Sequence, residues 1–241
     1  MGKLFVVGIG PGGLEHMTIK ARMAIEESSI IVGYTKYIEY IKPLLSGKEV
    51  FSTGMRGEIE RCQKSIQLAK DKTVAIISTG DSGIYGMAGL ILEMVDKETE
   101  VQLEVIPGVT ASSAAASLIG APLMHDNCNI SLSDLMTPYE IIKKRIKLAA
   151  DADFVISLYN PKSKGRANYL SESIDIIKNY RMDKTPVAVV KNALRESQEV
   201  YLYTLGNFKD DNVDMFSIVI IGNSKSFIKD GKFITPRGYK L

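Results

Sequence analysis

The sequence predicts an α/β protein of two domains, the first with a mainly parallel five-stranded sheet and the second with a mixed sheet. Short apolar runs alternate with helical patterns five times in the first half of the chain, which is typical of a parallel, doubly wound sheet. Three strand-like runs after residue 186 follow one another with little helix between them, which favours some antiparallel pairing. Because Gly120-Ala121-Pro122 punctuates the chain between these patterns, we place the domains at 1–119 and 120–241.

In the first domain, apolar runs bounded by turn residues indicate the strands. The predicted strands are 4–7, 30–32, 50–51, 74–77 and 101–106. The predicted helices are 18–27, 36–45 with its end near Pro43, 58–70, 85–95 and 112–119. The third helix is the clearest, because Ile59, Cys62, Ile66 and Ala69 recur at spacings of three and four residues. This spacing places Cys62 in the hydrophobic core.

The second domain opens with a strand at 129–132 and a helix at 138–150 that has Pro138 in its first turn. A strand at 154–158 leads through a polar loop into a helix at 169–179, and strands follow at 187–191, 200–204 and 215–221. We detect no internal repeat in either domain.

Composition and charge are those of an ordinary globular protein. The 241 residues suffice for one large domain or two smaller ones, and the net charge of +2 indicates no nucleic-acid or membrane partner. We see no apolar stretch of the ~20 residues that a membrane span needs. The N-terminal sequence also lacks signal-peptide and myristoylation patterns.

The residues that bind metals or form disulfides are sparse. Cys62 and Cys128 are the only cysteines, and they do not make a disulfide framework, so we expect a reduced, cytoplasmic location. His16 and His125 are far apart and lack ligand spacing, so we expect no protein-bound metal.

Three glycine-containing loops each follow a predicted strand of the first sheet: residues 8–13, 79–83 and 107–111. Loops at the carboxyl ends of parallel strands emerge on one edge of the sheet, where α/β proteins bind ligands. The second loop contains no Lys or Arg, and its ionisable group is Asp81. The third precedes a helix whose N-terminus suits a carboxylate. A ligand with both a cation and a carboxylate fits this pattern; S-adenosylmethionine (SAM) has that character, and so do other amino-acid derivatives.

A dinucleotide-binding Rossmann protein is the rival interpretation, because Gly8, Gly10 and Gly13 match G-x-G-x-x-G. However, Pro11 lies inside the fingerprint, where it offers no amide to a pyrophosphate. The second strand is followed by Gly33-Tyr34-Thr35 and not by a ribose-binding acid. No Walker A motif occurs.

Taken in order, the three loops resemble the signature blocks of the tetrapyrrole (corrin/porphyrin) methyltransferase family. The matching segments are Gly8-Ile9-Gly10-Pro11-Gly12, Gly80-Asp81-Ser82-Gly83 and Ile106-Pro107-Gly108-Val109-Thr110-Ala111. Further blocks resemble the branch that methylates carbon-17 of the corrin precursor, with ring contraction, in cobalamin biosynthesis: Thr53-Gly54-Met55-Arg56, Ile84-Tyr85-Gly86-Met87-Ala88, Leu158-Tyr159-Asn160-Pro161, Lys191-Asn192-Ala193-Leu194-Arg195 and Ile234-Thr235-Pro236-Arg237-Gly238-Tyr239. The chain departs from the family at Ser82, where proline is usual.

The resemblance implies SAM as methyl donor, bound in a cleft between two domains of a homodimer. The implied SAM contacts are Pro11, Thr79, Gly80, Asp81, Ile84, Thr110, Ala111, Tyr159 and Ala193. The implied substrate is a tetrapyrrole with carboxylate arms, for which Arg56, Arg195 and Arg237 are our candidate ligands, because guanidinium groups bind carboxylates bidentately. Lys162, Lys164 and Arg166 lie on a loop that could assist them.

Ring contraction would use a general acid or base, and our candidates are Asp81 first and Tyr85 second. Two alternatives stay open at this point. One is methylation at another position of a precorrin or porphyrin ring. The other is a non-catalytic SAM or nucleotide sensor on the same fold. The sequence does not indicate whether the substrate contains cobalt.

Overall fold

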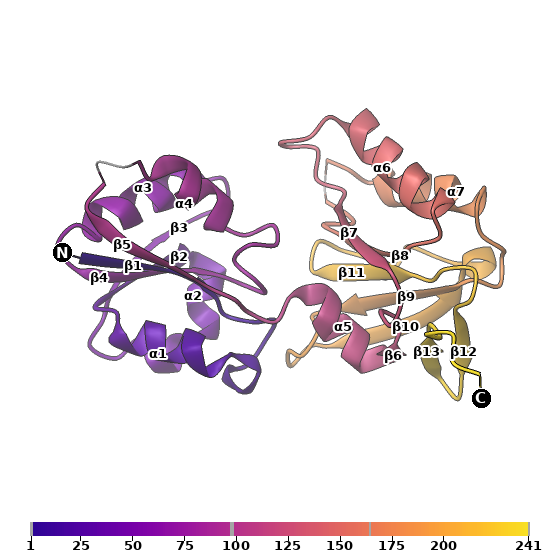
Figure 1. Ribbon diagram of the computed structural model, residues 1–241, viewed down its shortest axis with the longest axis horizontal. Coiled ribbons are helices and arrows are strands. Elements are labelled where there is room, and N and C mark those ends of the chain that lie inside the picture. The colour runs from indigo at the N-terminus through magenta and orange to yellow at the C-terminus, as the bar shows by residue number, and fades with distance from the viewer. Residues whose placement is uncertain (1, 97–98, 164, 241) are drawn as a thin grey trace. The chain divides into compact units, whose positions relative to one another are not determined.

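The computed structural model describes residues 2–96, 99–163 and 165–240. It divides into two compact units, Met1–Ala111 and Ser112–Leu241 (Figure 1). The division falls at the start of helix α5 (Ala111–Ile119), whereas the boundary that we placed from the sequence falls at the end of that helix.

The first unit contains a five-stranded sheet in the order β3-β2-β4-β1-β5. Its strands are β1 (Gly2–Gly8), β2 (Ile30–Tyr34), β3 (Glu49–Thr53), β4 (Thr73–Ser78) and β5 (Val101–Ile106). Every pairing in it is parallel, which confirms the predicted sheet. Because β1 lies between β4 and β5, the carboxyl ends of these three strands are adjacent.

Helices cover both faces of this sheet, with α1 (Ile19–Glu27) and α2 (Thr35–Tyr40) on one face and α3 (Glu58–Leu68) and α4 (Ala88–Met94) on the other (Figure 1). Successive strand residues point to opposite faces. Phe5 and Val7 therefore join the core under α1 and α2, while Leu4 and Val6 join the core under α3 and α4. Cys62 is fully buried in the second of these cores, as its helical spacing predicts.

Two predicted helices of this unit are shorter in the structure. Helix α2 ends at Tyr40, and the chain continues as a 3-10 turn, Lys42–Leu44, because Pro43 cannot supply the amide of a regular helix. Helix α4 begins at Ala88 and not at residue 85. Tyr85 has a φ of 56°, in the left-handed region that a right-handed helix does not admit.

The second unit contains a five-stranded sheet in the order β10-β9-β11-β8-β7. Its strands are β7 (Asn127–Ser131), β8 (Val155–Tyr159), β9 (Pro186–Lys191), β10 (Glu199–Thr204) and β11 (Ser217–Ile221). Only β7 and β8 pair in parallel; the other pairings described are antiparallel. The predicted mixed sheet is therefore confirmed.

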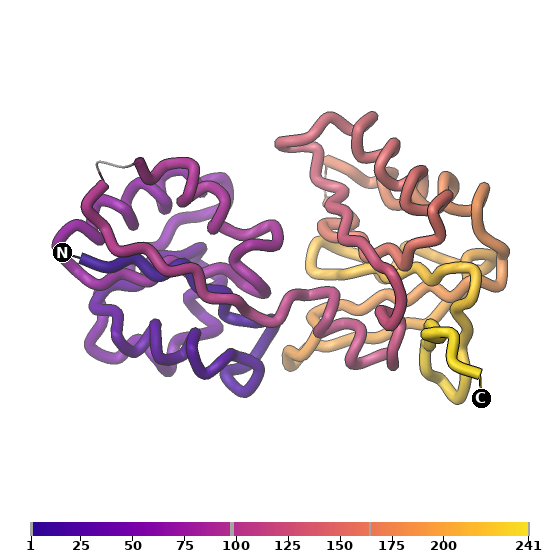
Figure 2. The backbone as a smooth tube through the Cα atoms, in the orientation of Figure 1, coloured from indigo at the N-terminus to yellow at the C-terminus, as the bar shows by residue number. Residues whose placement is uncertain are grey.

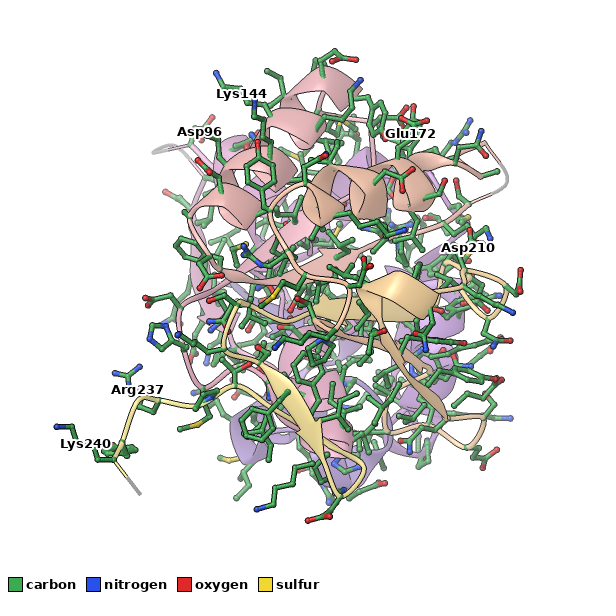
Figure 3. The ribbon with its side chains drawn as sticks, turned by 90° about the vertical axis from the view of Figure 1, so that its right-hand side faces the viewer. Asp96, Lys144, Glu172, Asp210, Arg237 and Lys240 are labelled. Atoms are coloured by element: carbon green, nitrogen blue, oxygen red, sulfur yellow. The ribbon has the colours of Figure 1, made fainter. Side chains whose placement is uncertain are left out.

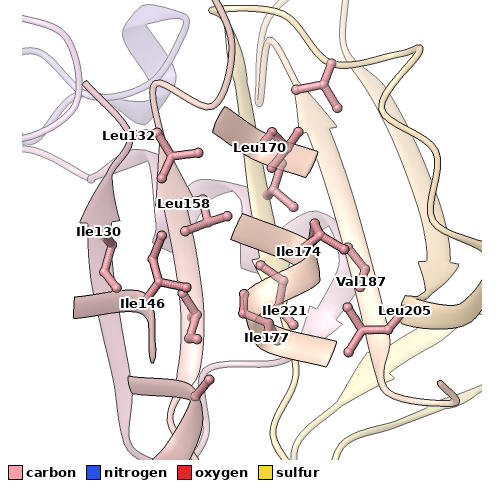
Figure 4. Packing of buried hydrophobic residues seen from close by; sticks show 14 of the residues in the cluster. Ile130, Leu132, Ile146, Leu158, Leu170, Ile174, Ile177, Val187, Leu205 and Ile221 are labelled. Atoms are coloured by element: carbon pink, nitrogen blue, oxygen red, sulfur yellow. The ribbon is translucent and has the colours of Figure 1, made fainter. Parts of the chain in front are cut away.

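Helices α6 (Tyr139–Asp151) and α7 (Tyr169–Lys178) run along one face of the second sheet (Figures 1 and 2). Figure 4 shows the core between them and the sheet, where Ile146 of α6 and Ile174 of α7 lie among side chains such as Leu158 and Val187. The 3-10 turn Leu205–Asn207 adds Leu205 to this core.

A small third sheet, in the order β12-β13-β6, was not predicted. It consists of β6 (Gly120–Ala121) and a hairpin of β12 (Phe227–Lys229) and β13 (Lys232–Ile234). Asp230 and Gly231 form the turn with φ of 49° and 70°. Positive φ at both central residues is what a two-residue hairpin turn requires.

Three further observations bear on function. Within the described ranges, no helix has both the length and the apolar character needed to cross a bilayer. The same residues contain no cluster of three or more His, Cys, Asp or Glu side chains arranged to hold a metal ion. Burial raises the pKa of both thiols, Cys62 and Cys128, to about 11, so both are protonated and weakly nucleophilic at neutral pH.

Candidate active site

The structure brings the three glycine loops together at the carboxyl ends of β1, β4 and β5. The first and second loops are joined by two backbone hydrogen bonds: the amide of Gly10 donates to the carbonyl of Gly80 at 3.1 Å, and the amide of Gly80 donates to the carbonyl of Gly10 at 2.7 Å. Gly10 and Gly80 have φ of 78° and 67°, which glycine adopts without steric cost.

Glycine is also required because the loops touch through their backbones. A Cβ on Gly8 would lie 2.7 Å from the amide nitrogen of Gly108 and 2.7 Å from the carbonyl oxygen of Gly80. A Cβ on Gly108 would lie 2.1 Å from that same oxygen. The three loops therefore form one cradle, which we call the glycine cradle, in which backbone atoms of different loops are in direct contact.

Asp81 connects the second loop to the third. One carboxylate oxygen accepts a hydrogen bond from the amide of Gly83 at 2.8 Å, and the other accepts one from the amide of Gly108 at 2.9 Å. Hydrogen bonds from backbone amides to a charged carboxylate are stronger than those to a neutral acceptor. The side chain thus fixes the shape of the glycine cradle, a role that its position in a loop did not reveal.

Ser82 stands where the family pattern has proline. Its side chain is buried, and its hydroxyl lies 3.2 Å from the carbonyl oxygen of Val6 and 3.3 Å from that of Ile106. The hydroxyl thus ties the second loop to the ends of β1 and β5. Serine provides a hydrogen bond here where proline would provide a fixed φ.

The remaining first-unit candidates lie in or beside the glycine cradle. Pro11 directly follows Gly10 and is buried; Thr79, Ile84, Thr110 and Ala111 are half-buried, and Tyr85 is 52% exposed. The cradle contains no Lys or Arg, so its charged side chain is an anion. It therefore suits the binding of a cation or of a neutral polar group.

In the second unit, Tyr159 lies at the end of β8 and is anchored to the start of α5. Its hydroxyl accepts a hydrogen bond from the amide of Ser112 at 3.0 Å and donates one to the hydroxyl of Ser112, also at 3.0 Å. One amide of the first turn of α5, which we expected to be available to a carboxylate, is therefore occupied by Tyr159. Ser112 is a contact that sequence reasoning missed, because nothing in its helical pattern distinguishes it.

Ala193 lies between Asn192 and Leu194, whose φ are 48° and 60°. The side chain of Asn192 donates to the hydroxyl of Ser197 at 3.0 Å, and the side-chain oxygen of Gln198 accepts from the amide of Leu194 at 3.0 Å. A leucine with positive φ is uncommon. The loop that carries Ala193 is thus held in one conformation by side chains farther along the chain.

Positive φ at residues other than glycine is concentrated in the segments that carry the family resemblance. Arg56, Tyr85, Asn160, Asn192 and Leu194 have φ between 48° and 67°. All five follow strand ends within those segments. Backbone strain of this kind persists where the surrounding structure enforces it, and it clusters at functional sites.

The candidate substrate arginines lie in three separate segments. Arg56 is exposed on the loop after β3, and Arg195 is half-buried in the loop after β9. Arg237 is exposed on the C-terminal segment, where its guanidinium lies 3.4 Å from the carbonyl oxygen of Met124 (Figure 3).

The basic loop of the second unit is largely committed to internal contacts. Lys162 donates to the carboxylate of Asp210 at 2.8 Å, and Arg166 donates to the carbonyl of Leu132 at 2.9 Å. Lys164 lies outside the described residues. Because Lys162 and Arg166 are engaged in these contacts, they are less available to bind the carboxylate arms of a substrate than we expected from the sequence.

Comparisons with known proteins agree with this arrangement. The model of the family "Tetrapyrrole (Corrin/Porphyrin) Methylases" matches residues 3–209. The chain is 52% identical over 240 residues to a probable cobalt-factor III C(17)-methyltransferase of Salmonella typhimurium, covering 99% of this chain and 100% of that protein. It is 37% identical to a precorrin-3B C(17)-methyltransferase of a Sinorhizobium species, covering 99% and 97%. The crystal structure of the methyltransferase CobJ superimposes with a TM-score of 0.92 at 31% identity, covering 98% of this chain and 100% of that one.

Proposed function

Because the chain belongs to the tetrapyrrole (corrin/porphyrin) methylase family, we propose that it transfers a methyl group from SAM to carbon-17 of a precorrin-3-type macrocycle, with ring contraction, in cobalamin biosynthesis. The relatives named as C(17)-methyltransferases match over nearly the whole chain. The structural observation that carries the proposal is the glycine cradle, three loops closed around Asp81 at the carboxyl ends of adjacent strands.

The residues of the glycine cradle fit SAM. Backbone atoms of Gly8, Gly80 and Gly108 pack so closely that a Cβ at Gly8 or Gly108 would overlap them, so these glycines hold the three loops together and the residues that flank them are left to contact the ligand. The negative charge of Asp81 and the absence of Lys and Arg from the cradle suit a sulfonium or an ammonium group. We propose that SAM contacts Pro11, Thr79, Gly80, Asp81, Ile84, Thr110 and Ala111, and that Tyr159 and Ala193 add contacts from the second unit.

When bound, SAM supplies the activated methyl group, and its transfer to a nucleophilic ring carbon is an in-line displacement. The protein contributes by holding the two reactants in line and by excluding water. In this scheme the carboxylate of Asp81 acts mainly by fixing the glycine cradle through the amides of Gly83 and Gly108. Tyr85, on a strained turn and half exposed, is our candidate for proton transfer during ring contraction.

We propose a cobalt-containing substrate, because the relative named for cobalt-factor III is 52% identical and the one named for precorrin-3B is 37% identical. The cobalt belongs to the substrate and needs no ligand from this chain.

The acetate and propionate arms of such a macrocycle require cationic partners, for which we propose Arg56, Arg195 and Arg237. We further propose that the enzyme works as a homodimer in the cytoplasm.

The proposal is tested by titrating the purified protein with S-adenosylhomocysteine (SAH) in a calorimeter, with NAD as a parallel titration. We expect one SAH site and no heat from NAD. The protein is then incubated with SAM carrying a ¹³C-labelled methyl group and with cobalt-factor III. Carbon-13 NMR of the product should place the label on carbon-17. Label at another ring carbon would contradict the position, and NAD binding without SAH binding would contradict the class of enzyme.

Replacing Asp81 by asparagine should weaken SAH binding and turnover together, by roughly tenfold or more. The asparagine side chain presents an NH₂ group to one of the two backbone amides that now donate to carboxylate oxygens. One of these amides, that of Gly83 in an exposed hydrogen bond or that of Gly108 in a partly buried one, then loses its acceptor, at a cost of about 1 kcal/mol in the free energy of unfolding. SAH affinity is measured by calorimetry and stability by urea denaturation.

The exposed Asp71, which lies in the turn between α3 and β4, provides the matched control, Asp71→Asn. We expect this control to match the wild type in both measurements. If Asp81→Asn abolishes turnover while SAH affinity and stability stay at wild-type values, Asp81 acts as an acid or base and not as an organiser of the loops.

A further inference from the structure

Arg61 of α3 is a buried arginine that faces the loop after β3. The residue is 5% exposed. Its Nη1 donates to Thr53 Oγ1 at 2.6 Å and to the carbonyl oxygen of Gly54 at 2.9 Å, and its Nη2 lies 3.4 Å from the carboxylate of Glu58. Its two shortest hydrogen bonds therefore go to the loop of residues 53–57, which we call the β3 loop.

A guanidinium is costly at this place. Burial removes most of its hydration, which costs free energy unless hydrogen bonds replace the water. Arg61 also lies near the N-terminal end of α3 (Glu58–Leu68), where the helix macrodipole disfavours a cation. An apolar side chain could fill the same space without these costs. The contacts to the β3 loop are what an apolar side chain would not provide.

The β3 loop is shaped by these contacts. A Cβ on Gly57 would lie 2.3 Å from Thr53 Oγ1 and 3.3 Å from Arg61 Nη1, so the two side chains fill the space beside this glycine. Arg61 also holds the chain between Thr53 and Gly57 through the carbonyl of Gly54. Within it, Arg56 adopts a φ of 67° and Met55 is 59% exposed. The loop thus presents a cation beside an apolar side chain, both open to solvent.

The β3 loop emerges from the same edge of the sheet as the glycine cradle. Strands β3, β2 and β4 are neighbours in a parallel sheet. Since neighbouring strands lie about 4.8 Å apart, the end of β3 is about 10 Å from the end of β4, where the second cradle loop begins. A tetrapyrrole macrocycle with its carboxylate arms extends over at least this distance. One substrate molecule can therefore reach both loops.

We propose that Arg61 is a positioning residue: it fixes the β3 loop so that Arg56 meets a carboxylate arm and Met55 meets the apolar face of the tetrapyrrole. This inference rests on the proposed function and concerns the substrate half of the same site. It assigns no contact with SAM to Arg61.

The test compares steady-state kinetics of Arg61→Gln and wild-type enzyme with cobalt-factor III and SAM as substrates. We expect the KM for cobalt-factor III to rise about tenfold, while the KM for SAM and the calorimetric Kd for SAH change by less than about twofold. Arg22→Gln is the matched control, because Arg22 pairs with Glu26 on the exposed face of α1. This control should behave as the wild type does.

Thr53→Val keeps Arg61 but removes its closest acceptor, so it should also raise the KM for cobalt-factor III. Thr53→Ser keeps the hydroxyl acceptor, and its KM for cobalt-factor III should equal that of the wild type.

A second readout does not need turnover. Amide hydrogen exchange of the segment 54–58 should be faster in Arg61→Gln than in wild type, with the cradle segments unchanged. Unchanged exchange in this segment would overturn the proposal, and so would faster exchange with an unchanged KM for cobalt-factor III. If Glu58→Gln reproduces the whole effect, the ion pair and not the loop contact is responsible, which also overturns it. Failure of the wild-type enzyme to methylate any tetrapyrrole would contradict the proposed function itself, before any variant is compared.

Discussion

Gly108→Ala should abolish detectable SAH binding and destabilise the first unit. The added Cβ would lie 2.1 Å from the carbonyl oxygen of Gly80 in the second loop and 2.6 Å from that of Gly8 at the end of β1, and neither backbone oxygen can move by a side-chain rotation. One loop must therefore move by about an ångström, and a displacement of this size at a binding site can cost about a hundredfold. The same overlap should cost about 3 kcal/mol in the free energy of unfolding.

Gly89→Ala is the matched control, because Gly89 lies within α4 and a Cβ there would meet nothing within 4 Å. We expect this variant to bind SAH normally and to be more stable by about 0.5–1 kcal/mol, since alanine loses less entropy than glycine in a helix. Calorimetry with SAH and urea denaturation give both quantities. If Gly108→Ala binds SAH as the wild type does, close backbone packing of the loops is not what forms the site.

The fold could be predicted from the sequence because its signals are local. The runs 4–7 and 74–77, which become the centres of β1 and β4, are continuously apolar and buried on both faces of a parallel sheet, so the face to which each side chain points does not matter. β5 lies at the edge of the sheet and alternates apolar residues with Gln102 and Glu104. The hairpin of β12 and β13 was missed although its signal was present. Asp230-Gly231 is a dipeptide typical of two-residue hairpin turns, but the flanking strands have only three residues each and do not alternate apolar with polar residues.

The candidate site was predictable only in part. The three loops had to share one edge of the sheet, because parallel strands end on one side. The partners of individual side chains did not follow from this reasoning. The two hydrogen bonds of Asp81 and the contacts of Arg61 with Thr53 and Gly54 join segments whose relative placement depends on the packing of the whole unit. Helical periodicity assigns Arg61 to a helix but does not distinguish it from a solvated arginine.

Arg181→Ala should produce the largest loss of stability that we expect in the second unit. The side chain is 3% exposed. Its guanidinium donates to the carbonyl of Ala150 at the end of α6, to that of Phe154 before β8 at 3.3 Å, and to that of Gly222 after β11 at 3.4 Å. It also pairs with the carboxylate of Asp153 at 3.1 Å. Burial lowers the pKa of this guanidinium, and Asp153 acts in the opposite direction.

Removing this guanidinium leaves the carbonyls of Ala150, Phe154 and Gly222 and the carboxylate of Asp153 without their shared partner. The expected cost is about 3–5 kcal/mol in the free energy of unfolding, since buried acceptors then lose a charged donor. Urea denaturation followed by circular dichroism should show a lower midpoint, with Arg181→Lys between the variant and the wild type because an ammonium cannot reach all of these oxygens at once. Arg145→Ala, on the exposed face of α6, should leave the midpoint unchanged. Equal midpoints for Arg181→Ala and Arg145→Ala would mean that water replaces the guanidinium among these carbonyls, and that packing of α6 and α7 on the sheet alone holds the second unit together.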